Sequence, residues 1–284
     1  MKIPKYWAKG TQSLPGPDGR MVAFSCWHWS DVSVAEAQQK ANARALNVAQ
    51  KFLNHQTLDR YSYGDRPLRE EVVQVVPGRS TPEAGLVTRN GYGALVLNTA
   101  NVMFIDIDFP SGADGGSLVG RLKGLFGKPQ PTLEERACQE IVAWARTRPD
   151  LGLRVYRTFG GLRCLVTNTL FDPRQEESAA LMRSLKSDPL YIQLCRVQEC
   201  FRARLTPKPW RCGVKLPPSR YPWENSVHEA RYRAWEREYT QAASPYVVCK
   251  LLQQIGPRQV HPEVEPVLTL HDRFTCAAAD RKLA

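Results

Sequence analysis

The stretch VMFIDIDF, from Val102 to Phe109, decides how this chain is interpreted. Its apolar residues predict a buried strand, and two acids, Asp106 and Asp108, interrupt them near its end. Residues two apart in a strand point to the same face, so both carboxylates project together. Two carboxylates this close repel each other unless a cation lies between them or one is protonated. Paired oxygen ligands suit Mg2+ or Mn2+ bound with a phosphate substrate, so we predict a catalytic metal site at Asp106 and Asp108.

The elements predicted from this strand onward alternate in the order β, α, β, β, α, β, which is a split βαβ or ferredoxin-like arrangement. They are strands over 101–109, 153–158, 162–168 and 200–205, and helices over 132–148, 176–186 and 188–197. This arrangement places the first and third strands side by side in the middle of one sheet, with the fourth strand at an edge. We therefore expect an α+β protein with a ferredoxin/RRM-like palm core.

The palm-like core is predicted to span residues 99–215, between an N-terminal α+β region at 1–98 and a C-terminal Pro/Arg-rich and helical region at 216–284. The N-terminal expectations are an irregular arm over 1–20, a strand over 21–29, a helix over 34–54, a helical turn or strand over 69–76, and a hairpin of strands at 85–89 and 93–97. The C-terminal expectations are helices near 228–241 and 266–283. Loops are expected over 59–67 and 110–131.

A net charge of +11 and a pI near 9.4 indicate a polyanionic partner. Between Glu199 and Glu224 the chain has no acid and six basic residues, interleaved with aromatic ones. So dense a patch repels itself, so we predict that four of the basic residues contact a nucleotide or a nucleic acid, DNA or RNA. These four are Arg202, Arg204, Lys208 and Arg211. The alternative is a solvated basic surface.

The segment RVYRTFGGLRCLVT, from Arg154 to Thr167, predicts a hairpin that turns at Gly160-Gly161. Glycines at a turn let a substrate approach the backbone closely. Arg157 and Arg163 on either side of the turn are therefore predicted to hold phosphate through bidentate hydrogen bonds. The alternative is an ordinary hairpin with arginines on its surface.

The compartment is predicted to be the cytoplasm. No apolar run approaches the roughly 20 residues needed to cross a bilayer, so no membrane partner is expected. The N-terminus MKIPKYWAKG lacks the apolar region of a signal peptide. The eight cysteines include no C-x-x-C pair, so we expect mostly reduced thiols rather than a zinc site. The sequence gives no indication of oligomeric state.

A buried hhhDhD strand that opens a β-α-β-β-α-β unit resembles the palm-like core of the archaeo-eukaryotic primase and primase-polymerase superfamily. FIDID, residues 104–108, is similar to the first metal-binding motif of that family. YRTFGGLRCLV, residues 156–166, resembles its Gly-rich segment, and FRARLTPKPWR, residues 201–211, resembles its late basic strand. The family segment ends in a histidine, where this chain has Arg163 or Cys164, and the third carboxylate motif of the family has no match.

The resemblance covers residues 95–215 and implies a metal-dependent nucleotidyltransferase. In such an enzyme Asp106 and Asp108 would hold Mg2+ or Mn2+ on a triphosphate, and the basic residues would neutralise phosphate charge. The missing histidine and third acid favour a second hypothesis, a non-catalytic nucleic-acid-binding module that keeps the palm fold. An acid pair near basic residues also fits a metal-dependent nuclease. An interaction protein with solvated or salt-bridged acids is the remaining alternative.

Overall fold

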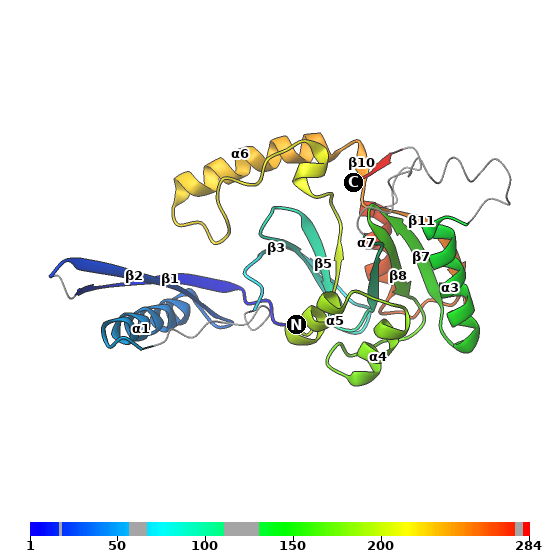
Figure 1. Ribbon diagram of the computed structural model, residues 1–284, viewed down its shortest axis with the longest axis horizontal. Coiled ribbons are helices and arrows are strands. Elements are labelled where there is room, and N and C mark those ends of the chain that lie inside the picture. Colours follow the sequence, from blue (N-terminus) through cyan, green and yellow to red (C-terminus); the bar gives the residue numbers. More distant parts are fainter. Residues whose placement is uncertain (17–18, 57–66, 111–130, 276–280) are drawn as a thin grey trace.

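The computed structural model describes residues 1–16, 19–56, 67–110, 131–275 and 281–284, and it shows a mixed α+β protein (Figure 1). These residues form six α-helices and four sheets, three of them antiparallel. None of the described helices is both long enough and apolar enough to cross a membrane. The predicted loops at 59–67 and 110–131 lie almost wholly outside the described residues. The predicted α+β class is therefore confirmed.

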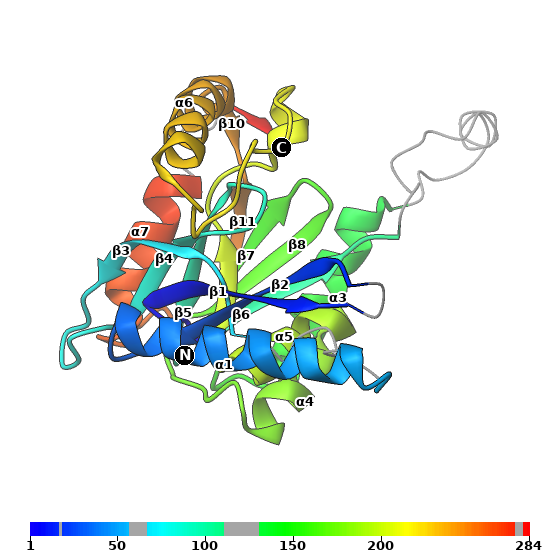
Figure 2. The ribbon, with the colours of Figure 1, turned by 90° about the vertical axis from the view of Figure 1, so that its left-hand side faces the viewer.

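The N-terminus forms a separate layer. Strands β1 (Tyr6–Pro15) and β2 (Met21–Ser30) pair along their whole lengths, and α1 (Val34–Leu53) lies on one face of the hairpin (Figure 2). The predicted irregular arm is wrong, because residues 6–15 form a strand. Its glycine has a packing role, since a Cβ on Gly10 would lie 2.3 Å from the backbone of Ala41 on α1. The approach of hairpin and helix therefore depends on glycine at this position.

The first four-stranded sheet has the strand order β3-β4-β5-β9. Its members are β3 (Glu71–Val76), β4 (Gly85–Arg89), β5 (Leu95–Thr99) and β9 (Phe201–Arg204). The predicted hairpin is confirmed, and Asn90 closes it by accepting the backbone N–H groups of Tyr92 and Ala94 on its side chain. The segment at 69–76, predicted as a turn or a strand, is a strand from Glu71.

The second four-stranded sheet has the strand order β11-β7-β8-β6. Its strands are β6 (Phe104–Asp108), β7 (Leu153–Thr158), β8 (Gly161–Val166) and β11 (Cys249–Ile255). The helices between them are α3 (Leu133–Thr147), α4 (Glu176–Ser184) and α5 (Pro189–Gln198). The predicted order of elements is confirmed, and β6 lies beside β8 as expected. Two details are wrong: β6 is an edge strand of this sheet, and β9 pairs with β5 in the other sheet.

The remaining elements follow β9. They are a short 3-10 helix η1 (Pro209–Cys212), α6 (Ser226–Ala243), β10 (Tyr246–Val247), α7 (Glu265–Thr275) and β12 (Lys282–Leu283). The predicted helix at 266–283 is too long, because α7 ends at Thr275 and residues 282–283 pair in parallel with β10. Two ladders, β5 with β9 and β7 with β11, cross the predicted domain boundaries, which stay a prediction.

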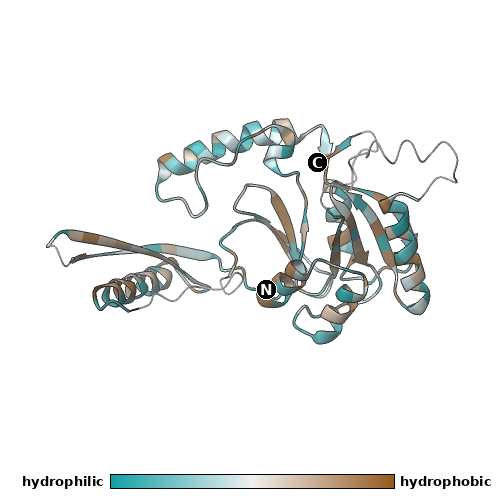
Figure 3. Cartoon of the chain, in the orientation of Figure 1, coloured by the Kyte–Doolittle hydropathy of each residue, from teal (hydrophilic) through white to brown (hydrophobic). Residues whose placement is uncertain are grey.

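The core positions β6 between two layers of helix. Ile107 on one face of β6 borders Ile141 on α3 and Leu185 at the end of α4. Phe104 on the other face contacts His271 on α7, with ring centroids 5.2 Å apart. Figure 3 shows apolar colouring concentrated on the sheet strands, while α6 is largely hydrophilic. Asp106 and Asp108 lie on the same face of β6 as Phe104. They follow Phe104 along the strand, beyond the residue that packs against α7.

Candidate metal and anion site

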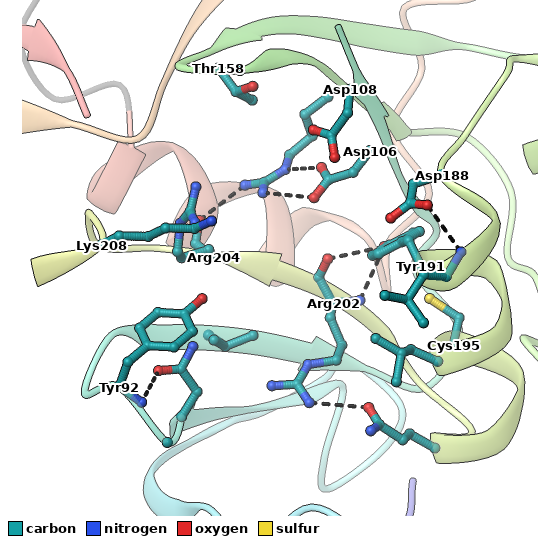
Figure 4. A pocket seen from close by; sticks show the side chains of 18 of the residues that line it. Tyr92, Asp106, Asp108, Thr158, Asp188, Tyr191, Cys195, Arg202, Arg204 and Lys208 are labelled. Atoms are coloured by element: carbon teal, nitrogen blue, oxygen red, sulfur yellow. Dashed lines mark hydrogen bonds and ion pairs between the residues drawn. The ribbon is translucent and has the colours of Figure 1, made fainter. Parts of the chain in front are cut away.

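The two sheets meet at β6 and β9, which are held together by side chains instead of a ladder. The Tyr191 hydroxyl lies 3.0 Å from the carbonyl oxygens of both Phe104 on β6 and Arg202 on β9. The Arg163 guanidinium on β8 donates to the carbonyl oxygen of Arg204, at 3.0 Å. The sheets diverge around a cavity of about 590 Å3, lined from both sides (Figure 4). This size falls in the range of small-molecule sites, about 300–1,000 Å3.

One side of the cavity is acidic and combines β6 with the start of α5. Asp106 and Asp108 both line it, as the alternation of the strand requires, and Asp188 joins them (Figure 4). Asp188 is the N-cap of α5, and its carboxylate accepts the Leu190 N–H at 3.0 Å. The Ser187 hydroxyl and the Asp188 N–H both donate to the carbonyl oxygen of Asp106, at 2.8 and 3.3 Å. These bonds fix the third carboxylate near the predicted pair.

Asp108 is the least compensated of these acids. Its carboxylate forms no hydrogen bond or ion pair with any described residue, and it lies beside Asp106 on the acidic side of the cavity (Figure 4). Partial burial raises the pKa of the Asp108 carboxyl above its ordinary value, and the charges of Asp106 and Asp188 raise it further. Ionised Asp108 therefore calls for a cation. Within the described ranges no three His, Cys, Asp or Glu side chains already enclose a metal position.

The donor set nevertheless fits Mg2+ or Mn2+. Mg2+ is commonly bound through one or two carboxylates, with water and substrate phosphates completing its shell. Asp106 and Asp108 supply two carboxylates on one face of β6, at the wall of a cavity large enough for a phosphate substrate. The predicted metal role of the pair stays a prediction.

Arg163 holds Asp106 in place. Its side chain is only 2% exposed, and its Nε and Nη2 donate to the Asp106 carboxylate at 2.8 and 3.4 Å. Burial alone would lower the pKa of the Arg163 guanidinium, but the charge and hydrogen bonds of Asp106 outweigh it and raise that pKa above its ordinary value. Arg163 lines the cavity with its charge already compensated, and its predicted phosphate contact stays a prediction.

The opposite side of the cavity carries three cations that we call the unpaired cations: Arg204, Lys208 and Arg211. None of them makes a salt bridge with a described residue, and Arg204 Nε and Arg211 Nη1 are buried donors without an acceptor. Burial lowers the pKa of Lys208, and Arg204 and Arg211 lower it further. Burial and Arg204 likewise lower the pKa of Arg211. A buried donor without a partner is costly, so this wall is suited to bind an anion.

Aromatic rings hold two of the unpaired cations over the cavity. The Arg211 guanidinium lies 3.9 Å from the centroid of the Phe159 ring, and Lys208 Nζ lies 5.5 Å from that of Trp210. Trp210 in turn meets Tyr92, a further lining residue, edge to face at 5.4 Å. Cation–π contacts leave the hydrogen-bond donors available for a ligand.

The other predicted arginines are neutralised by acids, and together with Arg163 we call them the paired cations. Arg157 forms a 2.8 Å ion pair with Glu134 and lies over the Phe109 ring, and it is not among the residues that line the cavity. Arg202 lines the cavity but donates to both oxygens of Glu70, at 2.8 and 2.9 Å. The basic residues predicted to bind phosphate thus divide into the paired and the unpaired cations, and the sequence does not distinguish these two groups.

Sequence reasoning missed Asp188, Glu70, Tyr191 and Tyr92 as site residues. Asp188 lies at the start of the helix predicted over 188–197, and its position in the sequence contains no signal of its distance from Asp106. Comparison with protein-family models, curated proteins and solved structures finds no match to this chain. The function therefore has to be inferred from the site itself.

Proposed function

We propose that this protein is a divalent-metal-dependent enzyme that transfers nucleotidyl groups from nucleoside triphosphates. One observation carries the proposal: an acidic wall with an uncompensated carboxylate faces three unpaired cations across a single cavity. A metal-bound triphosphate satisfies both walls at once, because its phosphates are anionic and its metal prefers carboxylates. A simple anion would satisfy only the unpaired cations and would be repelled by the acids.

Each wall has a separate task in this proposal. Asp106 and Asp108 would hold Mg2+ or Mn2+, and Arg163 keeps the Asp106 carboxylate in one orientation. When bound, the metal supplies charge neutralisation at the reacting phosphate and activation of the attacking oxygen. Arg204, Lys208 and Arg211 would bind the remaining phosphate oxygens and stabilise the negative charge of the departing group.

A primase-like palm is the fold interpretation that accompanies this function. It is supported by the β-α-β-β-α-β order and by the pairing of β8 with both β6 and β7. Asp188 supplies a third carboxylate, although from the cap of α5 rather than from a strand. Arg163 stands where the resemblance would place a histidine, and its ion pair with Asp106 gives that position a structural role.

The proposal is tested by incubating the protein with labelled nucleoside triphosphates and single-stranded nucleic acid, with Mg2+ or Mn2+. Incorporation and cyclisation are measured for the wild type and for Asp108→Asn, which removes one proposed ligand without disturbing an ion pair. We expect Asp108→Asn to lower turnover on the order of 10³-fold, because metal binding provides several kcal/mol of transition-state stabilisation. Asp150→Asn, the same change at an exposed acid outside the cavity, is the matched control and should retain full activity.

Other results would assign the site differently. Shortening of the labelled strand, dependent on metal and on Asp108, would identify a nuclease. Metal-independent strand binding that Asp108→Asn leaves unchanged, with no turnover on any metal, would identify a non-catalytic binding module. Turnover that survives Asp108→Asn would overturn the assignment of the metal site.

A further inference from the structure

The β1–β2 hairpin has one covered face and one aromatic face. Gly10 and Phe24 lie on the covered face, because Gly10 approaches the α1 backbone and the Phe24 ring lies 5.3 Å from Phe52 at the end of α1. The strand register then places three tryptophans on the opposite face, since Trp7 pairs with Trp29 and Lys9 with Trp27. Trp7, Trp27 and Trp29 are all partly exposed, and α6 lies on this side of the hairpin (Figures 1 and 2).

Cations accompany this tryptophan face. The Arg69 guanidinium lies 5.3 Å from the Trp27 ring centroid. Arg69 also lines a second cavity of about 210 Å3, together with the exposed Arg220 and with Tyr221. Arg220 makes no ion pair with a residue in the described part of the chain. Rings and cations therefore continue from the hairpin into the body of the protein.

The acids on this route are already neutralised. Among the described residues that line the second cavity, the acid is Glu71. Its carboxylate is paired with Arg233 and lies 3.8 Å from the Arg89 guanidinium. Glu224 forms a 2.6 Å ion pair with Lys9, which is paired with Trp27 in the hairpin. Arg220, which is exposed and has no ion pair with a described residue, adds a positive charge that suits a polyanion.

The second cavity opens toward the candidate active site. Both cavities are lined by Asn90 and Gly91 at the tip of the β4–β5 hairpin. A Cβ on Gly91 would meet no atom within 4 Å, so the space above this tip is open. The two cavities therefore adjoin each other at this tip.

We propose that a single-stranded nucleic acid follows this route, from the tryptophan face across Arg69 and Arg220 and over Gly91 into the cavity of Asp106. Aromatic rings stack on bases while cations neutralise phosphates, and that combination is characteristic of proteins that bind single strands without sequence preference. An acidic protein segment would use the cations but gain little from three tryptophans. A duplex presents its bases stacked inside and would not use the rings. The inference rests on the proposed function only for the end of the route inside the active-site cavity.

The test measures the affinity of the full chain for a labelled single-stranded oligonucleotide by fluorescence anisotropy, with EDTA present. We expect Trp27→Ala to weaken binding about tenfold, as the loss of one stacking ring does. Arg220→Ala should weaken it several-fold and reduce the salt slope by about one. Arg146→Ala, which removes an exposed cation on α3 outside both cavities, is the matched control and should bind like the wild type.

Gly91 provides a variant that preserves the hairpin packing. Gly91→Glu places a negative charge on the shared rim and should weaken binding about tenfold, whereas Gly91→Ala should have little effect. Equal affinity of Trp27→Ala, Arg220→Ala and Arg146→Ala would overturn the proposal. So would equally strong competition by duplex or by polyglutamate. Wild-type protein that binds the strand through Trp27 and Arg220 but turns over no nucleotide with Mg2+ or Mn2+ would overturn the enzyme proposal alone. Metal-dependent turnover, with affinities of Trp27→Ala and Arg220→Ala equal to that of the wild type, would overturn the strand route alone.

Discussion

The paired and the unpaired cations are all basic side chains in or near the region where the two sheets meet, yet they differ in whether an acid compensates their charge. Each paired cation has an acid within salt-bridge distance, and each therefore anchors one element to another. Among the unpaired cations, Arg204 and Arg211 have buried donors without acceptors, and burial lowers the pKa of Lys208 and Arg211. A cation that anchors the fold is already compensated, and a cation that the fold leaves uncompensated is available for a ligand. The difference identifies which arginines to test for binding and which to test for stability.

The largest effect is expected when a paired cation loses its acid. Asp106→Ala leaves the buried charge of Arg163 uncompensated, so we expect the free energy of unfolding to fall by about 3 kcal/mol. For a chain of this size the melting temperature should fall by roughly 10 °C. Thermal unfolding followed by circular dichroism in EDTA measures the change.

The matched experiment removes an unpaired cation instead. Arg211→Ala should leave the melting temperature unchanged or slightly higher, because no acid loses a partner. The double variant Asp106→Ala with Arg163→Met should recover much of the lost stability, since it removes both charges of the pair. Equal melting of Asp106→Ala and Arg211→Ala would contradict the distinction between the two groups.

The local features of this site could be predicted from the sequence. An apolar run with acids two apart predicts a strand with both acids on one face, and Gly160-Gly161 predicts the turn that joins β7 to β8 and brings Arg163 opposite Tyr156. The order of elements followed from hydrophobic periodicity and caps such as Thr132 on α3. These are short-range properties, and each depends on residues that are neighbours in the chain.

The partner of β9 could not be predicted, because two edges were available to it. In the structure β9 pairs with β5, and the Tyr191 hydroxyl bonds to carbonyl oxygens of both β6 and β9 where a ladder between them would form. Asp188 was missed for the same reason: its place beside Asp106 results from hydrogen bonds between segments about 80 residues apart. Strand β1 was not predicted, because Gly and Pro residues are typical of irregular segments. Its strand conformation depends on pairing with β2.

A smaller effect is expected on ligand affinity. Arg211→Ala and Arg204→Ala should each weaken binding of a Mg2+-bound nucleoside triphosphate about tenfold, because a hydrogen bond between charged groups contributes roughly 1.5–3 kcal/mol. Lys215→Ala is the matched control, since Lys215 is an exposed residue of the same basic segment that does not line the cavity. Isothermal titration calorimetry gives the affinities. A loss for Lys215→Ala as large as that for Arg211→Ala would show that overall charge, rather than the unpaired cations, determines binding.

The smallest effect concerns Asp108, an unpaired acid that faces the unpaired cations. Its pKa is raised by burial and by Asp106 and Asp188, so its ionised form is less favourable in the folded state than in the unfolded chain. The stability associated with this carboxyl is therefore fully present below its unfolded pKa of about 4 and is lost as the pH rises through the raised value. Asp108→Asn cannot ionise, so in EDTA at neutral pH it should melt about 2 °C above the wild type, a small gain because solvent screens a partly exposed group.

That gap should close as the pH falls below about 4, where the wild-type carboxyl is protonated like the neutral amide. It should also shrink or reverse at neutral pH when Mg2+ is added, because a metal that binds only the folded wild type stabilises it by mass action. Melting curves of both proteins over pH, with Mg2+ and with EDTA, measure the two effects. A gap that is independent of pH would contradict the raised pKa, and a gap that Mg2+ leaves unchanged would remove Asp108 from the proposed metal site. The two outcomes are separable, so the experiment tests the uncompensated charge and its proposed partner independently.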